Sequence, residues 1–249
     1  MITTEKVYYQ DFFKCECIAK IVKIDGNKVI LDRTVAFPEG GGQEGDRGIL
    51  ITSDNKQISF VDTKKGVGRI LHLDEFPAVQ VDTAVYHIID ESDSAYLEIG
   101  SSVTVRIDVP HRLGTTVMHS ALHIALMAAT ERVPEKVKRI KGCSITDHSA
   151  RLDFWTSERF TIEDMEWINM RVDEIVNADY DIKSYHHPEE NEAWYWKCED
   201  FICPCGGTHV SKSGDVGSIH VKRKSIGKNM ERLSVSLNNI RISENSYHV

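Results

Sequence analysis

The periodicity of apolar residues changes abruptly at Asp108-Val109-Pro110, and this change constrains the fold more than any other feature of the chain. Before it, short runs rich in β-branched residues alternate with turn signals such as Asp25-Gly26-Asn27. After it, apolar residues recur at the spacing of a helix. We therefore predict an α+β chain of two domains, residues 1–108 and residues 109–249.

The first domain is predicted to be a small β-barrel. Its short strands are expected at 14–24, 28–31, 48–52, 57–61, 69–73 and 102–107. Several short strands at this spacing are typical of a closed or nearly closed barrel. In the first strand, Cys15 and Cys17 would share one face of the sheet and pack in the core.

The second domain is predicted to pack helices on an antiparallel sheet. A first helix follows residue 111, with apolar residues at the i, i+3, i+4 positions Met118, Ala121, Leu122, Ala125, Leu126 and Ala129. We expect Thr115 or Thr116 to cap its start. A second helix begins at Thr161-Ile162-Glu163-Asp164, which is close to a capping box. Strands are expected at 181–185, 217–222 and 232–237.

Composition excludes several classes of protein. The chain has 249 residues, 41% of them hydrophobic, with 30 Lys and Arg against 38 Asp and Glu, for a net charge of −8. These values exclude wholesale disorder, and the acidic balance argues against binding duplex DNA through charge. We find no apolar run of the roughly 20 residues that span a bilayer and no secretory signal, so we expect a cytoplasmic protein without a membrane partner.

The C-terminal segment is basic although the whole chain is acidic. Residues 205–249 hold seven Lys and Arg against three Asp and Glu, with Lys222, Arg223 and Lys224 adjacent. Such a segment can contact nucleic-acid phosphates, or it can be a solvated hairpin with spare lysines.

Two pairs of residues, each four apart, form a candidate metal site. His119 and His123 lie on one face of the first predicted helix, and Cys205 and His209 flank two glycines. Three imidazoles and one thiolate suit tetrahedral Zn²⁺. Because the pairs are far apart in sequence, the fold would have to assemble the site.

Other residues nearby could also provide a ligand. Cys203 is the rival thiolate, Cys198 is a third, and one of His186 and His187 could contribute an imidazole. We prefer Cys205 because its spacing to His209 repeats that of the histidine pair.

A glycine-rich segment lies within the predicted barrel. Six of the thirteen residues 36–48 are Gly or Pro, which permits positive φ angles and close approach of another chain or ligand. The segment lacks the Gly-Lys-Ser/Thr ending of a phosphate loop, so it is not expected to bind nucleotides in that manner. It could equally be an elaborate hairpin turn.

Three motifs together resemble those of the alanyl-tRNA editing proteins, the AlaX family, which is similar to the editing domain of alanyl-tRNA synthetase. They are Phe37-Pro38-Glu39-Gly40-Gly41-Gly42-Gln43-Glu44-Gly45-Asp46, His119-Ser120-Ala121-Leu122-His123 and Cys205-Gly206-Gly207-Thr208-His209. The resemblance covers nearly the whole chain, and the presence of a barrel is similar to the medium-length class of the family.

The resemblance implies a zinc-dependent hydrolase that removes the amino acid from mischarged tRNA(Ala), chiefly Ser-tRNA(Ala). His119, His123, Cys205 and His209 would bind Zn²⁺. Gln43 and Ser144 are the candidate catalytic residues, with Gln43 positioning water, and Thr116, Lys222, Arg223 and Lys224 are candidates for binding substrate. Thr115 and Ser120 are further candidate partners of the serine hydroxyl.

Two alternatives remain open at this point. The chain could be a tRNA-binding module with a structural zinc and no catalysis, since four protein ligands normally make a closed, structural site. It could also be a hydrolase of a different small ester or amide.

Overall fold

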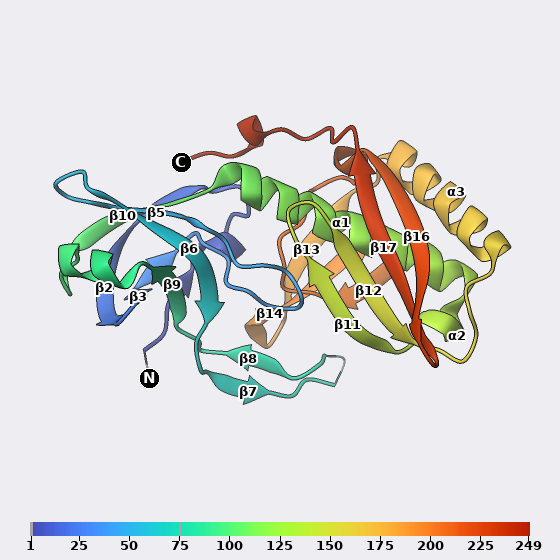
Figure 1. Cartoon of the computed structure of the whole chain (residues 1–249), viewed down its shortest axis with the longest axis horizontal. Helices are drawn as coiled ribbons and strands as arrows, with labels where there is room; N and C mark the ends of the chain where they lie inside the picture. Colours follow the sequence, from blue (N-terminus) through green and yellow to red (C-terminus); the bar gives the residue numbers. More distant parts are fainter. Residues whose placement is uncertain (1, 75) are drawn as a thin grey trace. The chain divides into compact units, whose positions relative to one another are not determined.

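The computed structural model describes residues 2–74 and 76–249, and the chain divides into two compact units (Figure 1). Unit 1 comprises the residues up to Gly40, Glu44–Arg112 and Glu244–Val249, and unit 2 comprises Gly41–Gln43 and Leu113–Ser243. The division at Arg112 lies four residues beyond the expected boundary. Three residues of the glycine-rich segment and the C-terminal residues also belong to the other unit, which the sequence analysis did not anticipate.

Unit 1 contains the predicted barrel. Its strands close in the order β10-β2-β3-β9-β6-β5, with bounds β2 Glu16–Asp25, β3 Lys28–Leu31, β5 Gly48–Thr52, β6 Gln57–Lys65, β9 Val85–Ile89 and β10 Ser102–Ile107. Smaller elements are β1 Glu5–Lys6, η1 Val7–Tyr9, β4 Arg33–Thr34, β7 Arg69–Leu71, β8 Val79–Val81 and η2 Glu91–Tyr96. Strand β9 differs from the prediction, which placed no strand there because His87 interrupts its apolar run.

His87 is fully buried inside the barrel. Its Nε2 is 2.8 Å from Thr34 Oγ1, and its Nδ1 is 3.3 Å from the carbonyl oxygen of Val29. Burial lowers the pKa of His87 to about 4. The ring is therefore neutral at neutral pH.

We expect His87 to make the barrel sensitive to acid. Its folded pKa lies below the ordinary 6.5, so the unfolded chain binds more protons between pH 6.5 and pH 4. The contribution of neutral His87 to the free energy of unfolding is fully present above pH 6.5. It is lost as the pH falls towards 4, at a cost of about 3 kcal/mol. In urea unfolding at several pH values, the free energy of unfolding should fall less on acidification for His87→Gln than for the unsubstituted chain. A matched variant of the exposed His148, His148→Gln, should keep the full fall, and equal falls in all three proteins would contradict the prediction.

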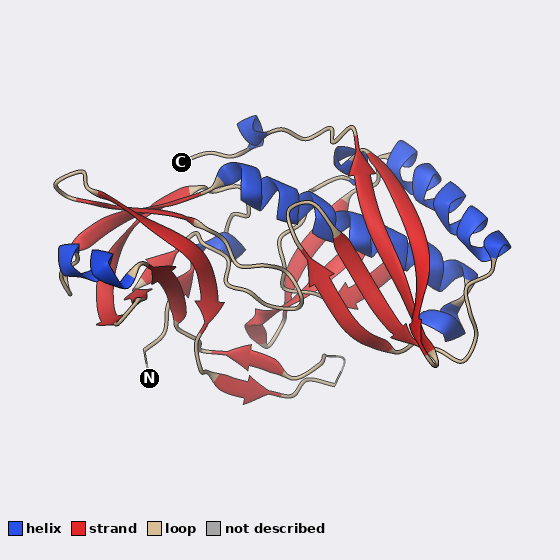
Figure 2. Cartoon of the chain, in the orientation of Figure 1, coloured by secondary structure: helices blue, strands red, loops and turns tan. Residues whose placement is uncertain are grey.

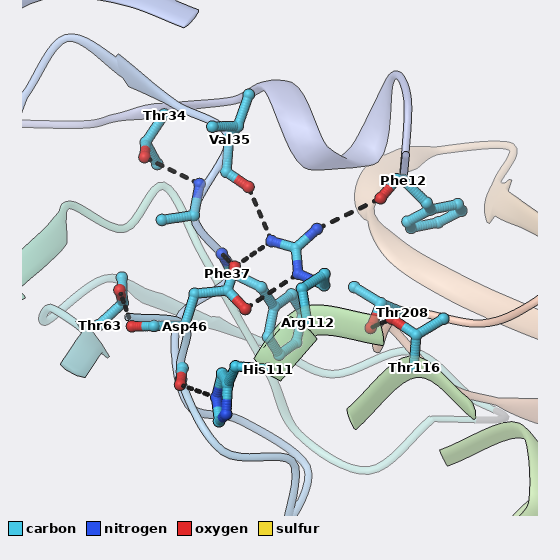
Figure 3. A network of polar contacts seen from close by, with 12 residues as sticks. Phe12, Thr34, Val35, Phe37, Asp46, Thr63, His111, Arg112, Thr116 and Thr208 are labelled. Carbon is cyan, nitrogen blue, oxygen red and sulfur yellow. Dashed lines mark hydrogen bonds and ion pairs between the residues drawn. The ribbon is translucent and has the colours of Figure 1, made fainter. Parts of the chain in front are cut away.

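A buried ion pair holds the part of the glycine-rich segment that belongs to unit 1 (Figure 3). The Arg112 guanidinium bonds to both carboxylate oxygens of Asp46, with Nε 2.9 Å from Oδ1, and it donates to the carbonyl oxygens of Val35 and Phe12. The Asp46 carboxylate also accepts from the backbone N–H of Phe37 at 2.7 Å. Burial alone would lower the pKa of Arg112, but the carboxylate of Asp46 raises it above its ordinary value.

Unit 2 combines helices with two antiparallel sheets, as the sequence predicted in outline (Figure 2). A four-stranded sheet has the order β11-β12-β17-β16, and a three-stranded sheet has the order β13-β14-β15. The helices are α1 Val109–Arg132, α2 Pro134–Val137 and α3 Ile162–Ala178, with the turns η3 Ser213–Val216 and η4 Glu244–Ser246, the latter in unit 1. The strands are β11 Ile140–Ile145, β12 Ala150–Trp155, β13 Ile182–His187, β14 Glu190–Cys198, β15 Phe201–Pro204, β16 Ser218–Gly227 and β17 Met230–Asn238.

Helix α1 is buried on nearly all sides within unit 2. Between Val117 and Ala129, only Leu126 is not fully buried. Its apolar residues join one core with residues of both sheets and α3. A helix that is enclosed in this way places any polar residue on it inside the protein, so His119 and His123 need partners there.

The two helix starts give different outcomes. The prediction that Thr115 or Thr116 caps α1 is wrong, because the helix already begins at Val109 and the carboxylate of Asp108 accepts from the backbone N–H of His111 at 3.3 Å. Pro110 is tolerated in the first turn, where backbone N–H groups have no helical partner. The capping box of Thr161 and Asp164 at the start of α3 is confirmed.

Helix α3 lies beside the edge strand β16 (Figure 1). The Asn169 side chain bonds to both backbone groups of Val221, at 2.9 and 3.0 Å, and so covers part of the strand edge. Within residues 2–74 and 76–249, no helix is both long enough and apolar enough to cross a membrane.

Candidate metal centre

The fold brings the two predicted residue pairs together in unit 2. One potential ligand atom from each of His119, His123, Cys205 and His209 lies within 4.8 Å of the others. The histidine pair comes from the buried helix α1, and the other pair comes from the segment that follows β15. Three imidazoles and a thiol at this separation fit a tetrahedral metal ion.

Two of the histidines have their Nε2 atoms towards the thiol of Cys205. Nε2 of His119 and of His209 lies 3.4 and 3.5 Å from Cys205 Sγ. Nε2 of His123 is buried and has no hydrogen-bond partner within the described structure. A buried, unpartnered nitrogen is costly unless a ligand occupies the position it faces, so this atom supports a metal at the centre of the group.

The Nδ1 atoms are held by a second layer of residues. His119 Nδ1 is 2.8 Å from Gln43 Oε1, His209 Nδ1 is 3.4 Å from Ser184 Oγ, and His123 Nδ1 is 3.5 Å from Cys203 Sγ. Metal-binding histidines commonly use one nitrogen for the metal and the other for such a partner. The rival thiol, Cys203, thus contacts the group from outside it.

The protonation states also suit a metal. Burial lowers the pKa of His123 to about 3, and it holds the pKa values of His119 and His209 well below the ordinary range. The three rings are therefore neutral and have a free electron pair. Burial raises the pKa of the Cys205 thiol to about 12, so this thiol needs a bound cation in order to ionise near neutral pH.

Gln43 links the glycine-rich segment to this group. Its Oε1 accepts from the backbone N–H of Thr208 at 3.1 Å as well as facing His119, and its Nε2 donates to Thr208 Oγ1 at 3.0 Å. With its carbonyl oxygen facing Nδ1, it selects the tautomer of His119 that carries hydrogen on Nδ1 and leaves Nε2 for a metal. We propose that Gln43 positions His119 through this contact.

Two glycines make these contacts possible. At Gly207, an added Cβ would lie 2.2 Å from the ring of His119 and 2.8 Å from Gln43 Oε1. At Gly42, where φ is +91°, a Cβ would lie 2.8 Å from the backbone of Cys143 in β11. Ile145 N–H donates to the carbonyl oxygen of Gly42 at 2.7 Å, which holds Gly42 against that strand.

We expect substitution of Gln43 to weaken metal binding without removing any ligand. Gln43→Leu should lower metal affinity by about 10- to 100-fold, the usual effect of losing such an outer partner. Gln43→Glu, which can still accept from Nδ1, should lower it less. Competition with a chelating dye measures the affinity, and an unchanged affinity in Gln43→Leu would contradict the positioning role.

The candidate hydroxyl residues make different contacts within unit 2. Thr116 Oγ1 is 2.8 Å from Thr208 Oγ1, so Thr116 lies behind Thr208 in the same buried network. Ser120 bonds to the backbone of Thr116 and Val210. Ser144 lies between Cys143 and Ile145, which pack on the core, and strand alternation therefore turns it to the other face of β11. The structure does not bring Ser144 to the metal group.

The basic residues lie at the other edge of the four-stranded sheet. Lys222, Arg223 and Lys224 are in β16, three strands and about 14 Å from β11. Lys222 and Lys224 are exposed, whereas Arg223 Nε is 3.1 Å from Oε2 of the buried Glu231 and its NH1 donates to the carbonyl oxygen of Phe160. Arg223 is therefore held by contacts within the protein, whereas the side chains of Lys222 and Lys224 face solvent.

Sequence reasoning missed Trp196 and Ser184. The Trp196 ring stacks on His123, with centroids 4.8 Å apart and an angle of 15°. Both residues come from the three-stranded sheet and contact histidines of the group, and the run of three aromatic residues Trp194, Tyr195 and Trp196 is the feature of the sequence that could have indicated this strand. Cys198, His186 and His187 are outside the group.

Comparisons with known proteins agree with the motifs. The model described as "tRNA synthetases class II (A)" matches residues 3–93, and that described as "Threonyl and Alanyl tRNA synthetase second additional domain" matches residues 196–234. The alanyl-tRNA editing protein AlaX-M of Pyrococcus horikoshii is 27% identical, over 94% of this chain and 98% of that protein.

Two longer proteins are also similar. The alanine–tRNA ligases of Sulfurisphaera tokodaii and Metallosphaera sedula are 29% and 30% identical over 88% of this chain. The chain spans only 24% of the length of each ligase.

Residues 196–234, which include Cys205 and His209 of the group, thus match the additional domain that threonyl and alanyl tRNA synthetases share. The similarity to an alanyl-tRNA editing protein over most of both chains agrees with the resemblance that the three motifs carry.

Proposed function

We propose that this protein is an alanyl-tRNA editing hydrolase that cleaves the ester bond of mischarged tRNA(Ala), chiefly Ser-tRNA(Ala), with Zn²⁺ held by His119, His123, Cys205 and His209. The observation that carries the proposal is the convergence of these four side chains, with Nε2 of His119 and of His209 towards the Cys205 thiol and Nδ1 of each histidine held from behind. We expect the protein to act in the cytoplasm, where charged tRNA is found.

The donor set supports zinc over harder metals. A thiolate and three imidazoles are soft or borderline ligands, whereas Mg²⁺ and Ca²⁺ prefer oxygen ligands. When bound, zinc would supply electrostatic stabilisation of the ester carbonyl or lower the pKa of a water molecule.

The protein residues supply position and exclusion of water. Gln43 holds His119, Ser184 faces His209, and Trp196 covers the ring of His123. The Thr116 and Thr208 hydroxyls form a buried pair that also contacts Gln43, and they are the proposed partners of the serine hydroxyl. A site that bonds a hydroxyl can reject the analogue that lacks it by up to about 10⁴-fold.

Release of serine from Ser-tRNA(Ala), compared with release of alanine from Ala-tRNA(Ala), tests this function. We expect the purified protein with one zinc ion per chain to release serine at least 100-fold faster than alanine. Equal rates with both tRNAs would reject the specificity. Zinc binding and tRNA binding without ester cleavage would favour the alternative, a tRNA-binding module with a structural zinc, which the four-ligand set also suits.

Lys222 and Lys224 are the proposed contacts for the acceptor end of tRNA on β16, and Arg223 is assigned to stability. With His220 and Glu166, Lys222 and Arg223 line an open groove between β16 and α3.

We expect Lys222→Glu with Lys224→Glu to weaken tRNA binding and to flatten its dependence on salt, since each phosphate contact adds to the salt slope. Arg223→Met should instead lower the free energy of unfolding, because it leaves the buried Glu231 without its cation. Filter binding at several salt concentrations measures the first effect and urea unfolding measures the second. Unchanged tRNA affinity in the double variant would show that both lysines are solvent-exposed residues that do not contact tRNA.

A further inference from the structure

One aromatic pair near the metal group has no role in the function described so far. His186 in β13 lies opposite Trp194 in β14, and their ring centroids are 5.8 Å apart at an angle of 74°. His186 is exposed and Trp194 is only partly buried, so the pair is not a core contact.

Strand alternation places this pair on the face that carries the metal group. Ser184, which contacts His209, and Trp196, which stacks on His123, are directly opposite each other in the register. His186 and Trp194 are each two residues away from them, on the same face and about 7 Å along the strands. The carbonyl oxygen of Trp194 also accepts from the backbone N–H of the metal ligand Cys205 at 2.7 Å.

We propose that His186 and Trp194 form the platform on which the adenine of the terminal nucleotide stacks while its ester lies at the metal group. This inference rests on the proposed function, in which the amino acid is esterified to a terminal adenosine. In such an ester only the ribose separates the carbonyl group from the nucleobase. A residue that binds the nucleobase must therefore lie about the width of one ribose from the metal group.

The chemistry of the pair suits a purine base. The indole of Trp194 provides a wide aromatic face, and stacking of one base on such a face is worth about 10-fold or more in affinity. Nδ1 of His186 is 2.9 Å from the carbonyl oxygen of His187, so Nδ1–H donates there and Nε2 is left to act as an acceptor. An acceptor at this position can bond the exocyclic amino group of adenine.

The opposite face of the same sheet provides the control. Tyr195 follows Trp194 directly, and its ring stacks on Tyr185, with centroids 5.3 Å apart, away from the metal group. A general effect of losing an aromatic residue from β14 would appear in Tyr195→Leu as well as in Trp194→Leu.

Binding of an ester analogue tests the platform. The probe is 3′-deoxy-3′-(L-serylamino)adenosine, in which an amide replaces the ester, compared by calorimetry with the same serylamino sugar bearing a methoxy group in place of adenine. We expect adenine to increase the affinity of the zinc-loaded protein about 10-fold. Trp194→Leu should reduce this gain below about 2-fold, whereas Trp194→Phe and Tyr195→Leu should retain most of it, all with one zinc per chain.

The outcomes separate this inference from the function on which it rests. An adenine gain that persists in Trp194→Leu, that falls equally in Tyr195→Leu, or that is absent from the unsubstituted protein would overturn the platform. If the gain depends on Trp194 but the protein releases no serine from Ser-tRNA(Ala), the platform stands and the proposed hydrolysis fails.

Discussion

Replacing Cys205 by Ser should remove the metal and lower the rate of serine release from Ser-tRNA(Ala) at least 1,000-fold. The thiolate is the only anionic ligand in the group of four, so its loss removes both a ligand and the charge that balances the cation. A 1,000-fold loss corresponds to about 4 kcal/mol of transition-state stabilisation, within the range that a bound metal supplies. Metal content by mass spectrometry and single-turnover deacylation measure the two effects.

The matched control for this prediction is Cys203→Ser. Cys203 is two residues away in the sequence, and its Sγ lies 3.5 Å from Nδ1 of His123, outside the ligand group. We expect Cys203→Ser to keep one zinc per chain. Loss of zinc in Cys203→Ser with retention in Cys205→Ser would show that the rival thiolate is the ligand. Retention of full activity by a zinc-free Cys205→Ser protein would reject the metal-dependent reaction.

Each pair of candidate metal ligands could be predicted because the spacing within the pair is local. Two residues four apart on a helix share a face in any fold, so His119 and His123 formed a pair before any tertiary contact was known. Their pairing with Cys205 and His209 depended on the chemistry of the combined set and on the family motifs. The structure confirms that the four converge.

The partners of these ligands could not be predicted, since they depend on long-range packing. Gln43 was singled out from the glycine-rich segment, but its contacts with His119 and Thr208 span 76 and 165 residues. Trp196 stands in a run of three aromatic residues, which does not indicate which of them faces the core. The cap of α1 was misplaced because Thr115 and Thr116 are good capping residues locally, whereas the helix continues to Val109 and buries both.

Strands with polar or glycine interruptions were missed for a similar reason. β11 contains Lys141 and Gly142, and β9 contains the buried His87, so neither shows clean alternation. Strand β9 is nevertheless stabilised by pairing with β3 and β6 on its two sides, and β11 is stabilised by pairing with β12 on one side. Tertiary packing outweighs local propensity in these strands.

The second large effect is expected at the buried ion pair of unit 1. Arg112→Met should lower the free energy of unfolding by about 3–5 kcal/mol, because it leaves the carboxylate of Asp46 buried without a cation. The side chains of Arg112 and Asp46 are 0% and 1% exposed, so water cannot replace the lost partner. Two backbone carbonyl oxygens, those of Val35 and Phe12, lose a donor as well.

Equilibrium unfolding in urea, followed by circular dichroism, measures this cost. Arg47→Met is the matched control, since Arg47 pairs with Asp108 in the same unit at 2.8 Å but the two side chains are 49% and 32% exposed. Screening by water should limit its cost to below about 1 kcal/mol. The double variant Arg112→Met with Asp46→Leu should recover part of the loss, because removing both charges removes the uncompensated one. A cost for Arg112→Met no larger than that for Arg47→Met would show that the buried pair does not stabilise the barrel, and that the glycine-rich segment is held by its backbone contacts alone.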